Sequence, residues 1–399
     1  MPPPRPHPLA RAPIVARLDR WLATAWEKGL LSRPPLDAEA IMRAGRGRYA
    51  GGDEEGGRSA EEVADFRIRL EHLSAALESE ARLNNLGRTI AHGQLTRVVR
   101  QRHALGRIWR QNPERARTAL ADPIIVIGQM RAGTTRIHRL LAADPAHSAT
   151  RFCDSWNPVP ARIDLRPLWS ALALFCGRRL DPWIDTIHPF GAGRVDEELG
   201  WLASALGASA YEAQWRIPAY GRFSEQRDAG PIYAEFARIL RMDAAFHGNA
   251  DRPRVMKVPQ FAEDLSELLR QFPRARLIIA RREDADVVRS AASLVANQMT
   301  IQSDHADMAW IEEEWTAKIA LRRERVQSAL AGHDAPIAEV NFDAISADWR
   351  SAVRWIYADL GLHLTPAAMK FMEREQQVAG QDAHHAHKGQ MAQFGEIAG

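Results

Sequence analysis

An apolar run over residues 123–127 is followed by a loop with a glycine near each end and then by apolar residues at helical spacing. The run contains consecutive β-branched residues, which are typical of a buried strand. Apolar residues recur three or four positions apart over 137–141 and stop before the Asp-Pro pair at 144–145, which predicts a helix. The pattern therefore predicts a strand, a loop over 128–135 and a helix.

The same alternation returns in the second half of the chain. Residues 255–259 and 277–280 form short apolar runs, separated by apolar residues at helical spacing that end before Pro273. A helical pattern follows over 284–295, and a late apolar run spans 337–340. Strands that alternate with helices predict an α/β fold with a parallel sheet flanked by helices. Ligands of such sheets bind at the carboxyl ends of the strands.

The beginning of the chain predicts helices only. Apolar stripes at helical spacing run over 18–31 and 63–77, and a further long helix is predicted over 83–111. Between the first two stripes, residues 45–57 hold six glycines. That composition is typical of a flexible connector or a mobile flap.

These patterns divide the chain into two regions, a helical N-terminal cap region over 1–120 and an α/β domain over 121–399. We interpret the helical region as a cap rather than a dimerisation element, with a homodimer left open. An aromatic-rich insert over 150–225 lies between the first two strands. It is placed to cover the ligand end of the sheet, although tryptophans at such irregular spacing are also typical of a plain core.

The loop over 128–135 has the character of an oxyanion cradle. Gly128 and Gly133 allow positive φ and close approach, so successive N–H groups can face an anion at the helix N-terminus. The spacing resembles the nucleotide-triphosphate motif G-x-x-x-x-G-K-[ST], but Thr134 stands where that motif has lysine. A kinase or ATPase is therefore disfavoured. Arg131 supplies a forked cation that suits one phosphate or sulfate ester.

The sequence Gly-Gln-Met-Arg-Ala-Gly-Thr-Thr after an apolar strand resembles the 5′-phosphosulfate loop of bacterial sulfotransferases that use 3′-phosphoadenosine-5′-phosphosulfate (PAPS). This family is related to the tyrosylprotein and cytosolic sulfotransferases, and the resemblance covers about 121–395. It implies a P-loop-like core and in-line transfer of a sulfuryl group from PAPS to a hydroxyl or amine of a small-molecule acceptor, with a general base and no metal. It also implies donor contacts for Gln129, Met130, Arg131, Ala132, Gly133, Thr134 and Thr135, with Arg131 acting in the transfer as well.

A cationic residue lies in the strand predicted over 255–259, and another follows the strand predicted over 277–280. Lys257 lies in the first, and Arg282 follows the second, with Ser290 eight residues further on in a predicted helix. In the resembled family an arginine and a serine at this spacing hold the nucleotide 3′-phosphate, which implies that role for Arg282 and Ser290. Lys257 corresponds to a lysine that precedes the catalytic histidine of cytosolic sulfotransferases, but Val258 follows it here. The base must therefore come from elsewhere.

The general base is left open among several residues. Asp154 occupies the place where the resembled bacterial and tyrosylprotein enzymes carry a glutamate, and we place it first. His188 and the pair Glu197–Glu198 are the alternatives, since similar His-Pro and acidic-pair patterns recur in these bacterial chains. Asp154 could equally cap a turn, and His188 could be a packed loop histidine.

The C-terminal segment over 381–399 has little apolar periodicity, as is typical of a disordered end. Its stretch 387–394 nevertheless resembles the tail that sulfotransferases place against the 3′-phosphate. The resemblance implies donor contacts for Lys388 and Gly389. Three histidines within 384–387 are interpreted as flanking this stretch, because no H-E-x-x-H spacing accompanies them to indicate a metal site.

Composition narrows the class of partner. The net charge of +3 and a pI of about 9.0 suit an anionic ligand and argue against nucleic acid. The two cysteines are too few for a disulfide framework, so a reducing compartment and a cytoplasmic location are expected. No apolar run is long enough to span a membrane.

Two other functional classes remain as alternatives to a sulfotransferase. A nucleotide-dependent kinase would need a loop lysine and a magnesium-binding carboxylate at a strand end, and neither is present in the sequence at those places. A non-catalytic nucleotide-binding protein would keep the cradle without a base in productive geometry.

Overall fold

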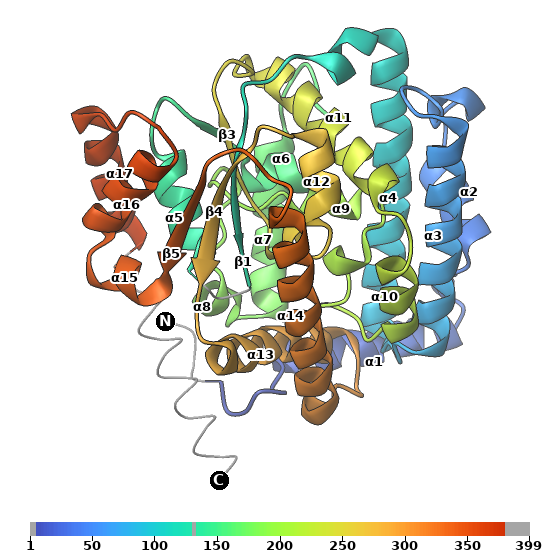
Figure 1. Cartoon of the computed structure of the whole chain (residues 1–399). Helices are drawn as coiled ribbons and strands as arrows, with labels where there is room; N and C mark the ends of the chain where they lie inside the picture. Colours follow the sequence, from blue (N-terminus) through green and yellow to red (C-terminus); the bar gives the residue numbers. More distant parts are fainter. Residues whose placement is uncertain (1–4, 130–132, 380–399) are drawn as a thin grey trace.

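The computed structural model of the chain describes residues 5–129 and 133–379 (Figure 1). Five parallel strands form one sheet in the order β2-β3-β1-β4-β5. The predicted α/β fold with a parallel sheet flanked by helices is confirmed. The strands are β1 Ile124–Gly128, β2 Ser148–Ala149, β3 Arg254–Lys257, β4 Arg276–Arg281 and β5 Ile337–Asn341.

The central strand β1 is buried on both faces. Ile124 and Val126 belong to one hydrophobic cluster, and Ile125 and Ile127 belong to another on the opposite face. Successive side chains of a strand point to opposite faces, so a strand covered on both sides reads as a continuous apolar run. This double burial is why the run was recognisable in the sequence.

One face of the sheet is covered by the loop helix and the C-terminal helices, at the left of Figure 1. Leu140 and Leu141 of the loop helix pack in the same cluster as Val353 and Ile356. The helices on this side are α5 Thr134–Ala142, α15 Phe342–Ala347, α16 Trp349–Asp359 and α17 Pro366–Ala379.

The other face is covered by helices from the middle of the chain and from its beginning. Phe66 and Leu70 of one N-terminal helix and Val99 of the next pack in the same cluster as Ile125 and Ile127 of the sheet. The predicted N-terminal helices therefore exist and share the core of the α/β region, while the division at residue 120 stays a prediction. The helices on this side are α2 Ala38–Arg46, α3 Ala60–Ser79, α4 Asn85–Gln111, α11 Gly230–His247 and α12 Leu265–Gln271. Helix α1 Pro13–Glu27 packs apart from the sheet, in a separate cluster with Leu86 of α4.

The glycine-rich stretch 45–57 is packed, and its prediction as a flexible connector or flap was wrong. Asp53 is fully buried and pairs with Arg110 at 2.5 Å. A Cβ added at Gly56 would lie 1.9 Å from the carbonyl oxygen of Gly106. The glycines thus allow two backbones to touch, a use that composition cannot distinguish from flexibility.

The aromatic-rich insert consists of short helices between β2 and β3. Trp201 and Trp215 are buried in the core, whereas Trp169 is exposed. Its helices are α6 Phe152–Trp156, α7 Arg166–Leu180, α8 Ile184–Ile187, α9 Leu199–Ala203 and α10 Pro218–Glu225.

The strand order reverses between β1 and β4. From β1 the chain runs through α5 to β2 at one edge, and from β4 it runs through α13 Asp284–Gln302 and α14 Met308–Leu330 to β5 at the other. The strands point downward in Figure 1, and α13 lies beneath their ends. Ligands of open α/β sheets bind where such connections diverge, so the loops that follow β1 and β4 are the expected site.

The close packing of α4 on α13 gives a stability prediction. A Cβ at Gly87 would lie 2.1 Å from the carbonyl oxygen of Gln302, so Gly87→Ala should lower the free energy of unfolding although alanine favours a helix by about 1 kcal/mol. Gly93 of the same helix has nothing within 4 Å of an added Cβ, and Gly93→Ala should stabilise by up to about 1 kcal/mol. Urea unfolding followed by circular dichroism measures both. Equal stability of the two variants would show that the close contact at Gly87 does not affect the free energy of unfolding.

Candidate active site

The loop after β1 needs glycine at both ends. A Cβ at Gly128 would lie 2.8 Å from Cγ2 of Thr134 and 2.9 Å from the carbonyl oxygen of Ala280. Gly133 begins α5 at a φ of +80°, and a Cβ there would lie 2.7 Å from the ring of Phe342. The backbone can therefore turn into α5 only with glycines at these positions.

The remaining loop residues divide into described and undescribed ones. Gln129 donates from Nε2 to the carbonyl oxygen of Ile319 at 3.2 Å, which ties the end of β1 to α14. Thr134 is buried at the first position of α5. Three predicted donor contacts, Met130, Arg131 and Ala132, lie outside the described residues.

A buried lysine joins the neighbouring strand to the loop helix. Nζ of Lys257, at the end of β3, donates to Oγ1 of Thr135 at 2.9 Å and forms a close ion pair with Glu197. The side chain of Lys257 is 1% exposed. Three groups that the sequence singled out separately, the loop, the lysine and the acidic pair, therefore meet at the carboxyl edge of the sheet.

Glu198, the second member of the acidic pair, faces the other way. Its Oε2 accepts a hydrogen bond from the backbone N–H of Lys257 at 3.0 Å, and the residue is fully buried. Burial raises the pKa of Glu198 to about 8, although hydrogen bonds from Thr150 and from the Lys257 backbone act in the opposite direction. Glu198 thus holds the end of β3 in place beneath the site.

His188 forms a dyad with an aspartate that sequence reasoning missed. Nε2 of His188 lies 3.0 Å from Oδ1 of Asp196. Asp196 is buried, which on its own would raise the pKa of its carboxyl group, but the charge and hydrogen bond of His188 hold that pKa below the usual value. Ligand atoms of His188, Asp196 and Glu197 all lie within 4.8 Å of one another. The only sequence signal was that Asp196 directly precedes the acidic pair.

The loop that carries His188 is tied to α5 by a second residue that the sequence did not reveal. Arg139 donates to the carbonyl oxygens of Pro189 at 2.9 Å and Val195 at 3.3 Å. The helix that begins at the cradle therefore also positions the dyad.

Asp154 is surrounded by cations. Its carboxylate lies 2.6 Å from Arg151, 3.1 Å from Arg166 of α7 and 3.5 Å from His247 of α11. Burial would raise the pKa of Asp154, but the nearby His247, the hydrogen bonds from Arg151 and the charge of Arg166 outweigh burial and hold that pKa far below its usual range. A carboxylate in this state accepts a proton poorly, so the geometry disfavours the base role that the sequence placed first.

Arg282 lies near the loop on the other side of β1. It follows the end of β4, and its guanidinium carbon is 4.4 Å from the ring centre of Phe342. The same ring is the nearest neighbour of a Cβ built at Gly133. Ser290 is buried in α13. The two remaining predicted donor contacts, Lys388 and Gly389, lie outside the described residues.

Two groups of side chains in the described part of the chain have metal-like spacing. One is Asp154, Asp243 and His247, and the other is His188, Asp196 and Glu197. Arginines pair with Asp154 and Asp243 in the first group, and Lys257 pairs with Glu197 in the second. These cations already compensate the carboxylates, so we do not propose a metal at either group.

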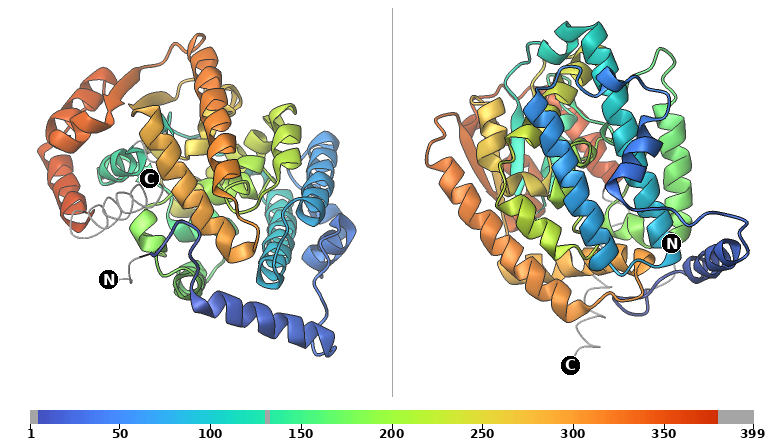
Figure 2. Two further views of the ribbon diagram at one scale, coloured as in Figure 1. Left: turned by 90° about the horizontal axis from the view of Figure 1, so that it is seen from below. Right: turned by 90° about the vertical axis from the view of Figure 1, so that its right-hand side faces the viewer.

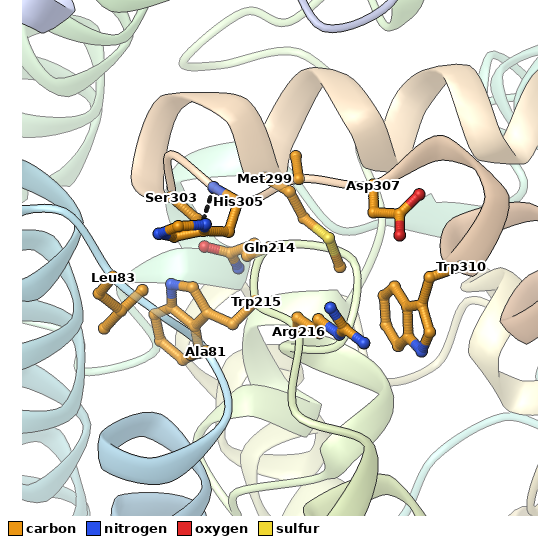
Figure 3. A pocket seen from close by; sticks show the side chains of 11 residues that line it. Ala81, Leu83, Gln214, Trp215, Arg216, Met299, Ser303, His305, Asp307 and Trp310 are labelled. Carbon is orange, nitrogen blue, oxygen red and sulfur yellow. Dashed lines mark hydrogen bonds between the residues drawn. The ribbon is translucent and has the colours of Figure 1, made fainter.

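Figure 3 shows a small hollow between the end of α13 and the segment before α10. Trp215, Met299, Arg216 and Trp310 line it, with the Arg216 guanidinium 4.7 Å from the ring centre of Trp310. No residue of the predicted site lines this hollow, so it is not the candidate site.

Comparison with known proteins decides the family. A model described as "Sulfotransferase family" matches residues 123–366. The chain belongs to the sulfotransferase family. The sulfotransferase STF1 from Mycobacterium tuberculosis H37Rv superimposes with a TM-score of 0.72 at 23% identity, over 90% of this chain and 99% of that one. STF9 from Mycobacterium avium gives 0.74 at 20% identity, over 87% and 89%.

Structural likeness at this identity shows that the sulfotransferase fold extends beyond the matched segment into the N-terminal helices. No curated protein sequence matches this sulfotransferase-family chain. Among its described residues, no helix is long and apolar enough to cross a membrane. The resemblance read from the loop is thus confirmed at the level of the family and the fold.

The raised pKa of Glu198 gives a pH-dependent prediction. Between pH 4.5 and 8 the folded protein keeps this proton while the unfolded chain releases it, so the contribution of Glu198 to stability is greatest below 4.5 and falls as pH rises to about 8. Glu198→Gln has no proton to lose. Its stability relative to the wild type should therefore increase from pH 5 to pH 8, by at most about 1.4 kcal/mol per pH unit. Urea unfolding at several pH values measures the difference, and a difference that does not change with pH would contradict the assignment.

Proposed function

We propose that this protein transfers a sulfuryl group from PAPS to a hydroxyl or amine of a small-molecule acceptor. The observation that supports this most directly is the contact of Lys257 Nζ with Thr135 Oγ1 at 2.9 Å. It places a buried cation at the first turn of a loop helix that has no lysine in its own loop. A cation beside an oxyanion cradle suits a single sulfuryl or phosphoryl group.

The residues around the loop fit the donor at both of its ends. The glycine-bounded loop and the N-terminus of α5 suit the 5′-phosphosulfate, with Arg131 as a further contact. Arg282 and Ser290 suit the 3′-phosphate, and Arg282 lies over the same Phe342 ring that approaches Gly133. Lys388 and Gly389 complete the proposed donor site.

When bound, PAPS supplies the sulfuryl group and the bridging oxygen on which negative charge develops. Lys257 holds protons at Nζ where it can stabilise that charge, and Glu197 orients it. His188 uses Nε2 to bond Asp196, which leaves Nδ1 as the nitrogen to accept the proton of the acceptor. Asp196 would then stabilise the imidazolium. His188 is therefore our proposed base in preference to Asp154 and to the fully buried Glu198.

Thermal unfolding with three ligands tests the function. The product of PAPS, adenosine 3′,5′-bisphosphate, and PAPS itself should raise the melting temperature, while ATP with magnesium at the same concentration should have a much smaller effect, because only a bound ligand shifts the unfolding equilibrium. Selective stabilisation by ATP would overturn the proposal in favour of a kinase. Stabilisation by the bisphosphate without transfer of labelled sulfate to any alcohol, phenol or amine in a panel would favour a non-catalytic nucleotide-binding protein.

Arg282 gives a sharper binding prediction. Arg282→Ala should raise the Kd of adenosine 3′,5′-bisphosphate about tenfold or more, since a charge-assisted hydrogen bond contributes about 1.5–3 kcal/mol. The Kd of adenosine 5′-monophosphate, which lacks the 3′-phosphate, should hardly change. Isothermal titration calorimetry measures both.

The neighbouring arginine is a matched control. Arg281 pairs with Glu339 at 2.7 Å on the exposed side of β4, so Arg281→Ala should leave both affinities unchanged. Equal losses of the two nucleotides in Arg282→Ala would remove the 3′-phosphate assignment.

Variants of His188 and Asp154 distinguish the proposed base from the alternative. His188→Ala should lower kcat by about 10²–10⁴-fold while the Kd of adenosine 3′,5′-bisphosphate is retained, because a base acts in the transition state. Turnover of labelled PAPS with the best acceptor of the panel is the measurement.

Asp154→Asn provides the comparison. It should lower the free energy of unfolding, because Arg151, Arg166 and His247 lose the charge of a buried partner, and should leave kcat of the folded protein within a few-fold. A stable Asp154→Asn variant without turnover, beside an active His188→Ala variant, would return the role of base to Asp154.

A further inference from the structure

Helix α7 carries its apolar side chains on the outside of the molecule. Leu165, Leu168, Leu172 and Phe175, at spacings of three, four and three residues, are 45%, 60%, 52% and 55% exposed, and Trp169 beside them is 57% exposed. Such spacing places side chains on one stripe of a helix. We call these five residues the α7 face.

The buried residues of α7 beneath this face are polar. Arg166 is buried and lies 3.1 Å from Asp154, and Ser170 is buried and accepts a hydrogen bond from Asn157 at 3.1 Å. Turning the α7 face inward would leave Asp154 and Arg166 without each other, which is costly for buried charges. The outward orientation of the apolar stripe is therefore fixed by an ion pair beneath it.

Arginines flank the α7 face. Arg162 and Arg179 are exposed near its two ends, and the Arg179 guanidinium lies 4.9 Å from the ring centre of Phe175. The only carboxylate in 161–180, Asp164, is paired with Arg166 at 2.8 Å. The surroundings of the stripe are thus positive at both ends.

We propose that the α7 face docks this protein on an anionic lipid surface. Aromatic and leucine side chains flanked by arginines are typical of helices that lie in the interface of a membrane without crossing it. Five large apolar side chains that are exposed side by side mark an interaction site. A negatively charged headgroup layer over an apolar interior complements both the arginines and the stripe.

A second copy of the chain fits the α7 face less well. If two α7 helices paired antiparallel, Arg162 of one would face Arg179 of the other, and if they paired parallel, each arginine would face its own copy. Either arrangement opposes like charges, which is unfavourable at an interface.

The α7 face adjoins the candidate site. Arg178 of α7 donates to the carbonyl oxygen of Phe190 at 2.9 Å, and the ring of Phe190 lies with its centre 4.5 Å from that of His188. The right-hand panel of Figure 2 shows α7 at the margin of the molecule, with α1 below it. If the proposed function holds, docking brings the base to acceptors at the lipid surface, but the docking itself does not depend on that function.

Sedimentation of the full chain with vesicles tests the proposal. Trp169→Ser/Phe175→Ser should reduce the fraction bound to vesicles of phosphatidylglycerol and phosphatidylcholine by at least about fivefold, since it removes two exposed apolar side chains. The matched control is Trp355→Ser/Phe371→Ser, which removes a tryptophan and a phenylalanine of 60% and 42% exposure from α16 and α17. It should bind like the wild type. Circular dichroism checks that all variants are folded.

A second experiment tests the contribution of the two flanking arginines. Arg162→Gln/Arg179→Gln should weaken binding to the anionic vesicles by about fivefold for each charge and leave binding to pure phosphatidylcholine unchanged. Failure of the wild type to sediment with either vesicle, or equal losses in both aromatic double variants, would overturn the proposal. So would a wild-type dimer in analytical ultracentrifugation that Trp169→Ser/Phe175→Ser converts to monomer, because a second copy would then cover the face.

Discussion

The buried ammonium group of Lys257 is the interaction on which the arrangement of the candidate site depends. A charge taken out of water is costly unless it is paired and hydrogen-bonded, and Lys257 is compensated by Glu197 and Thr135. These partners come from the aromatic-rich insert and from the loop helix. Three parts of the chain that are far apart in sequence must therefore reach their places together, and the backbone of Lys257 is held from below by Glu198.

Buried ion pairs recur through the scaffold. Arg58 pairs with Glu235 at 2.5 Å between the N-terminal region and α11, and Arg322 of α14 pairs with Glu263 at 2.9 Å. Pairs of this kind contribute little net stability, but removing one partner is costly. Their main effect is therefore to determine which surfaces of the protein pack together. The N-terminal helices are joined to the sheet region by ion pairs as well as by apolar packing.

The sequence predicted the features that depend on residues close together along the chain. It did not predict those that depend on partners far apart along the chain. The strand, loop and helix over 124–142 were recognisable because burial on both faces and a short turn leave local patterns. The pairing of Asp154 with Arg166 and His247 was not, since the partners come from helices 12 and 93 residues away along the chain. The sequence shows the position of Asp154 but not its cationic neighbours, on which our preference for His188 as the proposed base depends. Composition predicted a flexible connector over 45–57 because it could not show such distant neighbours: Gly56, for example, packs against Gly106 of α4.

Phe342 has a consequence for nucleotide selection. Its ring lies close to Gly133, and its centre is 4.4 Å from the guanidinium carbon of Arg282, at the junction where β5 passes into α15. A single aromatic side chain from a third segment therefore contacts both of the proposed binding elements. A substitution at Phe342 would therefore act on both proposed ends of the nucleotide site rather than on one end alone.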